Sequence, residues 1–315
     1  MKRVQSFLKH LNPTDAVIIV FALFLSHLNI IYHDKIGDWL NFVIYNTVVI
    51  LLITGIVFMT QISNGELWKQ LHYWYIAPLI VLAYKELYFM IKPIRGVDYD
   101  AALIAIDRFL FGTDPTHFLY SIANPFLTEL LQIVYGTFFF LPIILGINLL
   151  LKHKESDFHF AVFSIIFGFL LSYIGYILVP AIGPRFTLHN FELNDIEIPG
   201  LFLTNYLREF VNAGESIPSG TLNPAEVVQR DVFPSGHTQM TLIVMYLSVK
   251  FRTGTRYFFL PVGTLLIFST VYLRYHYVVD LIGGLFFMVL TLWAGKKLYN
   301  HWQKFRGGET FEYTN

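Results

Sequence analysis

A histidine and an aspartate four residues apart are the strongest candidates for chemistry in this sequence. His276 and Asp280 lie in the stretch RYHYVVD, and residues four apart share one face of a helix. The carboxylate can therefore hydrogen-bond the imidazole, which fixes its tautomer and leaves the other ring nitrogen free to attack. The alternative for this stretch is a purely structural His–Asp pair. If the pair is functional, it predicts a histidine nucleophile.

A second candidate is the stretch Pro234-Ser235-Gly236-His237, which opens an apolar run. Proline costs no hydrogen bond in the first turn of a helix, and Ser235 can cap that turn. The free N–H groups and the helix dipole then form an anion site beside His237. A histidine that only caps the helix is the alternative. A second Pro-Ser-Gly at 218–220 has neither apolar run nor histidine after it, so we interpret it as an ordinary turn.

A third candidate is Arg185, in the stretch GPRF at the end of an apolar run. Its planar fork of donors suits a phosphate group. An arginine that reaches toward lipid headgroups is the alternative. These three stretches need a scaffold that brings them together.

The composition indicates that this scaffold lies in a membrane. The chain has 315 residues, of which 55% are hydrophobic and only 14% charged, outside the range of ordinary soluble domains. About eight apolar stretches are long enough to cross roughly 30 Å of hydrocarbon. We expect them at 15–32, 39–60, 72–91, 128–151, 158–179, 235–251, 257–275 and 278–298. The predicted fold class is all-α, a polytopic transmembrane helix bundle.

Charges in the loops predict the orientation. Thirteen of the 22 lysines and arginines fall on the side of both termini, and positive loops resist translocation. The termini are therefore expected in the cytoplasm, and all three candidate stretches on the opposite, extracytoplasmic face. Residues 100–126 are expected to form an amphipathic helix in the membrane interface, either as an entry platform for lipid or as a structural connector. The acidic loop at residues 187–233, here called the lid segment, is expected to cover the site.

Together the three stretches resemble the type 2 phosphatidic acid phosphatase superfamily of membrane lipid phosphatases and phosphotransferases. The order and spacing of the motifs match over about residues 72–298, which implies a six-helix phosphatase core. We therefore expect three parts: two transmembrane helices at 1–71, the core at 72–298, and a polar, loosely ordered cytoplasmic tail at 299–315. The stretch DRFLFG at 107–112 is similar to the branch that contains inositol phosphorylceramide synthase.

The resemblance implies a role for each candidate residue. His276 would be the nucleophile that takes the phosphoryl group, Asp280 would orient it, and His237 would protonate the leaving oxygen. Three groups would hold the phosphate oxygens: Arg185, Ser235 and the backbone of Gly236. The chemistry requires no metal and no cofactor.

Two basic residues that are usual in the family are missing. Leu178 stands where a lysine is usual, and Ser269-Thr270 stands where Ser-Arg is usual. We expect Arg274, two residues before the nucleophile, to contact the phosphate and replace part of this charge.

The predicted function is hydrolysis of a lipid phosphate through a phosphohistidine at the extracytoplasmic face. The substrate would be a lipid phosphate or phospholipid in the bilayer, and nothing in the charge pattern indicates nucleic acid. Transfer of the headgroup to an alcohol such as inositol or ceramide is the alternative. A transporter is a weaker alternative, suggested by polar residues inside the third and fourth spans: Lys85, Glu86, Glu129 and Gln132. A third alternative is a membrane scaffold without catalytic activity. It predicts a defective motif, whereas both histidines and the aspartate are present.

Overall fold

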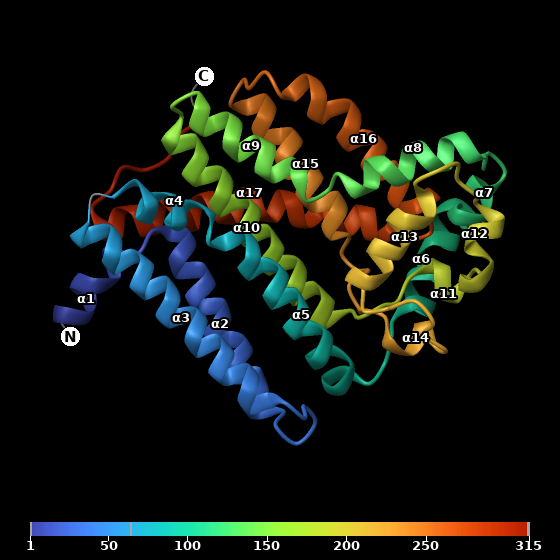
Figure 1. Cartoon of the computed structure of the whole chain (residues 1–315), viewed down its shortest axis with the longest axis horizontal. Coiled ribbons are helices and arrows are strands. Elements are labelled where there is room, and N and C mark those ends of the chain that lie inside the picture. Colours follow the sequence, from blue (N-terminus) through green and yellow to red (C-terminus); the bar gives the residue numbers. More distant parts are fainter. Residues whose placement is uncertain (1, 64, 314–315) are drawn as a thin grey trace.

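The structure is a computed structural model that describes residues 2–63 and 65–313, and over these residues its regular elements are all helices. Figure 1 shows long helices side by side at one end and short helices gathered at the other. The helices of the bundle are α2 (Pro13–Ile31), α3 (Trp39–Ile62), α4 (Glu66–Trp74), α5 (Ile76–Arg95), α8 (Pro125–Gly136), α9 (Phe140–Leu151), α10 (Glu155–Leu178), α15 (Gly236–Lys250), α16 (Arg256–Tyr272) and α17 (Val278–Arg306). The other elements are α1 (Lys2–Leu8), α6 (Asp100–Phe111), α7 (Pro115–Tyr120), α11 (Pro184–Thr187), η1 (Phe191–Leu193), α12 (Asn194–Glu197), α13 (Thr204–Gly214) and α14 (Pro224–Val227). The all-α bundle expected from the sequence is confirmed.

Each of the eight apolar stretches contains helix, but not every helix has the length of a span. Within the described residues, five helical segments are long and apolar enough to cross a membrane, and α8 with α9 makes a sixth if the pair counts as one span bent by 52°. Helix α16 has 17 residues and α15 has 15. At 1.5 Å per residue these two extend only about 22–26 Å. Five or six of the roughly eight expected spans therefore have the length and composition of a full membrane span.

Helix α10 lies at the centre of the bundle because it is buried along most of its length. Its first half, with Phe158, Phe160 and Phe163, belongs to an aromatic and aliphatic core shared with α9, α15, α16 and α17. Its second half, with Leu170 and Tyr173, belongs to a second core shared with α2, α3 and α5. Residues on all sides of α10 are apolar, as expected for a helix without a solvent face.

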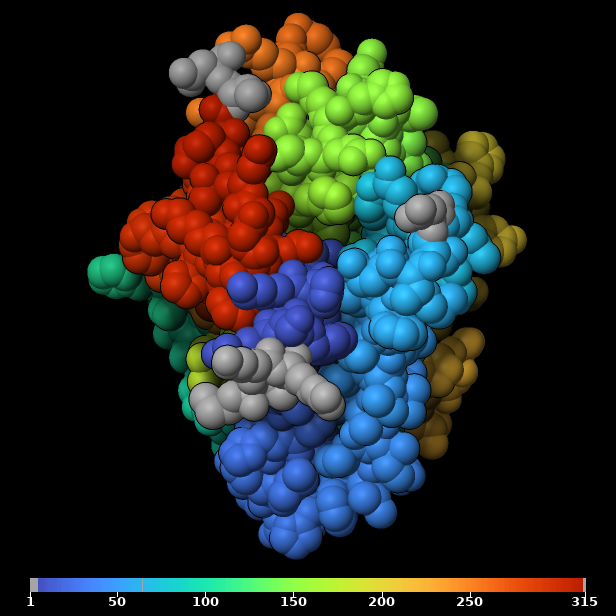
Figure 2. Space-filling model, turned by 90° about the vertical axis from the view of Figure 1, so that its left-hand side faces the viewer, coloured from blue at the N-terminus to red at the C-terminus, as the bar shows by residue number. Residues whose placement is uncertain are grey.

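The two ends of the chain lie at the same end of the molecule. Figure 2 shows the C-terminal helix beside the N-terminal helices, and the indole N–H of Trp302 donates to the carbonyl of Leu11 over 2.9 Å. The tail expected to be loosely ordered is instead packed as far as it is described. Helix α17 continues to Arg306, and the ring of Phe311 is buried and stacked 3.9 Å from that of Phe160.

The opposite end carries the connections that follow α5 and α10. Helices α6, α7 and α11 to α14 gather there, over the first turns of α15 and α17 (Figure 1). The three candidate stretches meet under these short helices.

Candidate active site

The Pro-Ser-Gly-His stretch forms the start of α15. Ser235 is the N-cap, and its hydroxyl oxygen accepts the N–H of Thr238 over 3.2 Å. The N–H of Ser235 donates to the carbonyl of Asp280 over 3.0 Å. A Cβ on Gly284 would lie 2.7 Å from the carbonyl oxygen of Ser235, so only glycine allows α17 to approach this closely. The first turns of α15 and α17 are thus held against one another.

His276 and Asp280 meet at the start of α17. Their closest atoms, Nδ1 of His276 and Oδ2 of Asp280, are 3.4 Å apart, and both side chains are almost completely buried. The same Oδ2 accepts the N–H of Tyr277 over 2.7 Å. A separation of 3.4 Å is longer than an ordinary N–H···O bond, as is common in sites without substrate. Asp280 therefore faces Nδ1, which leaves Nε2 as the nitrogen away from the carboxylate.

The fold brings the two predicted catalytic histidines together. The ring centroids of His237 and His276 are 5.7 Å apart, although 39 positions separate them in the chain. The two rings are therefore close enough to line the same site.

Tyr135 of α8 supports His237 and was not anticipated from the sequence. Its ring stacks on His237 at 4.6 Å and on Tyr275 at 4.6 Å. The guanidinium of Arg185 lies over the other ring of this stack, 4.9 Å from the centroid of Tyr275. A continuous stack thus joins the predicted general acid to the predicted phosphate-binding arginine.

Arg185 is buried at the start of the short helix α11, with 3% of its side chain exposed. Its backbone N–H donates to the carbonyl of Arg274 over 3.1 Å, which ties the Arg185 stretch to the stretch that contains His276 and Asp280. Gly183 precedes it with φ +93°, and a Cβ there would lie 2.8 Å from the carbonyl oxygen of Tyr275. This conformation and this contact both require glycine.

The guanidinium of Arg185 is engaged by the lid segment. Nη1 donates to Oδ1 of Asn212 over 2.9 Å, and Nη2 pairs with the carboxylate of Glu215. The lid segment therefore reaches the site, as expected.

Arg274 lies differently from the expectation. Its guanidinium pairs with the carboxylate of Glu197, lies 3.3 Å from Oδ1 of Asn194, and is 5.5 Å from the ring centroid of Tyr120. Within the described part of the chain, no hydrogen bond or ion pair joins it to either histidine. Its backbone has φ +68°, and its side chain points toward α7 and α12.

Two carboxylates of α6 hold the Arg185 stretch and the His276–Asp280 stretch in place. Asp100 accepts the N–H groups of Ile182 and Gly183 and the hydroxyl of Tyr277. Asp107 accepts the N–H groups of Val278 and Val279 over 2.8 Å each, and so caps α17.

The orientation of α6 differs from that of a simple interfacial helix. Asp100 and Asp107 are buried, whereas Phe109 is 86% exposed. The acidic side faces the protein and the aromatic side faces outward. Two carboxylates seven residues apart on one helical face were the signal in the sequence.

Burial sets the protonation of the predicted nucleophile. His276 lies in the connection between α16 and α17, and burial lowers its pKa to about 4, while the carboxylate of Asp231 acts in the opposite direction. Burial also raises the pKa of Asp231, whose carboxylate accepts the hydroxyl of Tyr84 over 2.8 Å. At neutral pH the His276 imidazole is therefore uncharged, as a nucleophile must be.

Of the polar residues that suggested a transporter, Lys85 and Glu129 make structural contacts with the lid segment. Lys85 donates to the carbonyl of Gly214 and to Ser216 of the lid segment. Glu129 accepts the N–H groups of four consecutive residues, 201–204, and thereby anchors the start of α13. Gln132 is buried, with no hydrogen-bond partner for its amide among the residues described.

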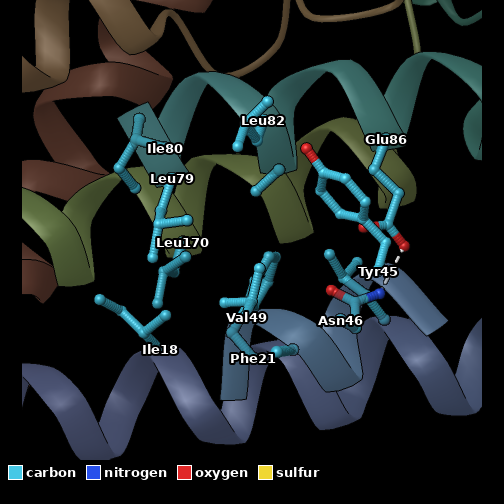
Figure 3. Close-up of a pocket in the computed structure, with 13 residues that line it drawn as sticks. Ile18, Phe21, Tyr45, Asn46, Val49, Leu79, Ile80, Leu82, Glu86 and Leu170 are labelled. Atoms are coloured by element: carbon cyan, nitrogen blue, oxygen red, sulfur yellow. Dashed lines mark hydrogen bonds between the residues drawn. The ribbon is translucent and has the colours of Figure 1, made fainter. Parts of the chain in front are cut away.

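Glu86 lies in a different place, between the N-terminal helices and α5. It accepts the amide N–H groups of Asn29 and Asn46 over 2.8 Å each. Figure 3 shows it at the edge of an apolar cavity of about 30 Å³. Such a volume holds about one water molecule, so this cavity is no substrate site.

Comparison with known proteins gives one match. The model of the PAP2 superfamily matches residues 101–294, which is more than half of the chain. This range contains Arg185, both histidines and Asp280, and it begins within α6. No curated protein and no solved structure matches the chain significantly.

Proposed function

Because the chain belongs to the PAP2 superfamily, we propose that it is a multi-pass membrane enzyme that hydrolyses a lipid phosphate through a phosphohistidine. The observation that carries this proposal is the 5.7 Å separation of the His237 and His276 rings. The aromatic stack of Tyr135 and Tyr275 connects Arg185 to His237. Besides burial, the charge of Arg185 lowers the pKa of His276. These groups supply the three requirements of phosphoryl transfer, namely a nucleophile, an acid and a positioned cation.

In the first step, Nε2 of His276 attacks the phosphorus atom of the lipid phosphate. The bond from phosphorus to the lipid oxygen breaks, and His237 donates a proton to that oxygen. Asp280 holds the proton on Nδ1 of His276 and stabilises the positive charge that forms on the ring. Arg185, Ser235 and the N–H groups at the start of α15 bind the phosphoryl oxygens.

In the second step, a water molecule attacks the phosphohistidine. His237 takes a proton from this water, the phosphorus–nitrogen bond breaks, and inorganic phosphate leaves. His276 returns to its neutral form, so the cycle closes with one water consumed.

Transfer of the headgroup to an alcohol is the second candidate, as in the inositol phosphorylceramide synthase-like branch. The lid segment favours it, because Asn212 and Glu215 cover Arg185 and shield it from bulk water. An alcohol such as inositol or ceramide would then replace water in the second step. Water exclusion and positioning of the hydroxyl are what such a transfer needs.

We place the site at the extracytoplasmic face. Both termini lie at one end of the molecule and the site elements at the other (Figure 1), and the basic loops lie on the side of the termini.

Product analysis tests the proposal. Purified protein is incubated with a short-chain lipid phosphate, with and without inositol or ceramide, and products are followed by mass spectrometry. Steady release of phosphate without an alcohol supports the phosphatase, whereas turnover only with an alcohol supports the transferase. His276→Ala is the control, and an active His276→Ala protein would refute the phosphohistidine mechanism.

A further inference from the structure

The predicted phosphate-binding arginine already holds an anion from its own chain. The carboxylate of Glu215 pairs with Nη2 of Arg185, and the amide oxygen of Asn212 binds Nη1. Carboxylate and phosphate oxygens occupy the same positions on a guanidinium fork. Glu215 therefore lies where a phosphate oxygen is expected to bind.

The position of Glu215 is fixed on both sides. Lys85 of α5 donates to the carbonyl of Gly214 and to the hydroxyl of Ser216. The N–H of Gln229 donates to the carbonyl of Glu215 itself over 3.1 Å. The contact with Arg185 is thus built into the fold rather than made by a free surface side chain.

The charges leave little attraction for a second anion. Arg185 is 3% exposed and Glu215 is 16% exposed, so solvent screens the pair weakly. A phosphate placed beside the ionised Glu215 would be repelled at short range, where like charges disfavour one another strongly. Binding of phosphate thus requires that Glu215 move away or lose its charge.

We propose that Glu215 is a gate that competes with substrate phosphate for Arg185. This inference rests on the proposed function, because it takes Arg185 as the phosphate ligand. With the gate closed, Arg185 is neutralised and the site is covered by the C-terminal end of α13. With the gate open, Arg185 is free to bind the phosphoryl group next to His276.

Protonation offers a way to open the gate. Burial raises the pKa of Glu215 to about 7, while Arg185 acts in the opposite direction. The other charged groups near it are Asp231, which raises the pKa, and Lys85, which lowers it. Below this pKa the carboxyl is neutral and competes weakly for Arg185. Above it the carboxylate competes fully, so anion binding should weaken as the pH rises through about 7.

The test compares Glu215→Gln with wild type and with Glu209→Gln, an exposed carboxylate on the same helix. Binding of inorganic phosphate is measured by calorimetry at pH 8. We expect Glu215→Gln to bind phosphate roughly tenfold more tightly or better, since a repelling charge is removed at short range. Glu209→Gln should match wild type. Equal or weaker binding by Glu215→Gln would overturn the gate.

A second measurement needs no variant of the gate. Sulfate, which stays doubly charged in this range, should bind wild type more tightly at pH 5.5 than at pH 8. Sulfate affinity that does not change between these values would contradict the gate.

The gate and the phosphate site fail in different ways. If wild type binds phosphate through Arg185, shown by loss of binding in Arg185→Gln, and Glu215→Gln changes nothing, the gate alone is wrong. If neither wild type nor Glu215→Gln binds phosphate, Arg185 is not a phosphate ligand, and both proposals are wrong.

Discussion

Removal of the Asp107 carboxylate should loosen the start of α17, on which the predicted nucleophile depends. Asp107 accepts the N–H groups of Val278 and Val279 over 2.8 Å each. These residues lie two and three positions after His276 and belong to the first turn of α17, which also contains Asp280. The side chain is buried, with 2% exposed, so no water can simply take its place.

The magnitude follows from the two hydrogen bonds. A buried N–H group left without an acceptor costs about 1–3 kcal/mol. Asp107→Ala leaves two such groups and should lower the free energy of unfolding by roughly 2–6 kcal/mol. Asp107→Asn keeps one carbonyl acceptor, so roughly 1–3 kcal/mol is expected. In both variants kcat should fall by more than the loss of folded protein explains, because His276 and Asp280 lose their alignment.

Thermal unfolding in detergent and turnover on a lipid phosphate measure the two effects. The control is Asp34→Ala, which removes an exposed aspartate in the connection between α2 and α3. A change at an exposed side chain usually alters stability by no more than about 0.5 kcal/mol. If Asp107→Ala unfolds at the same temperature as Asp34→Ala and turns over normally, Asp107 does not support the site.

Three further predictions concern the histidines and the topology. His276→Ala should abolish turnover, and His237→Ala should reduce kcat by roughly 10²–10⁴-fold, the usual contribution of general acid–base catalysis; purified variants at equal amount decide this. His276 must be neutral to attack, and its pKa is lowered to about 4; as the pH is lowered from 7, kcat/KM should therefore fall only near pH 4, and a fall near pH 6.5 on this acid side would contradict the burial of His276. The chain has no cysteine, so Glu209→Cys should react with an impermeant maleimide on intact cells and Glu309→Cys only after permeabilisation; the reverse would overturn the orientation.

The fold could be predicted largely from local composition. Long apolar stretches predict helices reliably because backbone groups in lipid must bond within their own segment. The lengths of the helices and the packing of the C-terminal segment were less predictable. Helices α15 and α16 are shorter than a full span, because their outer turns belong to the site. Phe311 lies in a segment of polar composition, yet it fills a gap beside Phe160 that only the tertiary structure creates.

The candidate site was predictable where its residues are close in the chain. The spacing of His276 and Asp280 places them on one face, and Ser235 was recognisable as a cap. That His237 and His276 belong to one site, by contrast, was predictable only from the family resemblance. Amphipathicity of α6 indicated a polar face but not its direction, since in a membrane protein the apolar face can point outward. For Arg274, charge alone suggested a phosphate ligand, whereas its side chain points toward Glu197.

The charge balance of the site links the lid segment to substrate binding. Arg185 and Arg274 each pair with a carboxylate of the lid segment, Glu215 and Glu197. With few cations present, one internal carboxylate removes a large share of the attraction for phosphate. Movement of the lid segment and binding of phosphate are then coupled. A change that raises the population of the open form raises the affinity for phosphate, and bound phosphate in turn favours the open form. The lid segment would thereby admit a phosphate group and exclude bulk water with a single contact.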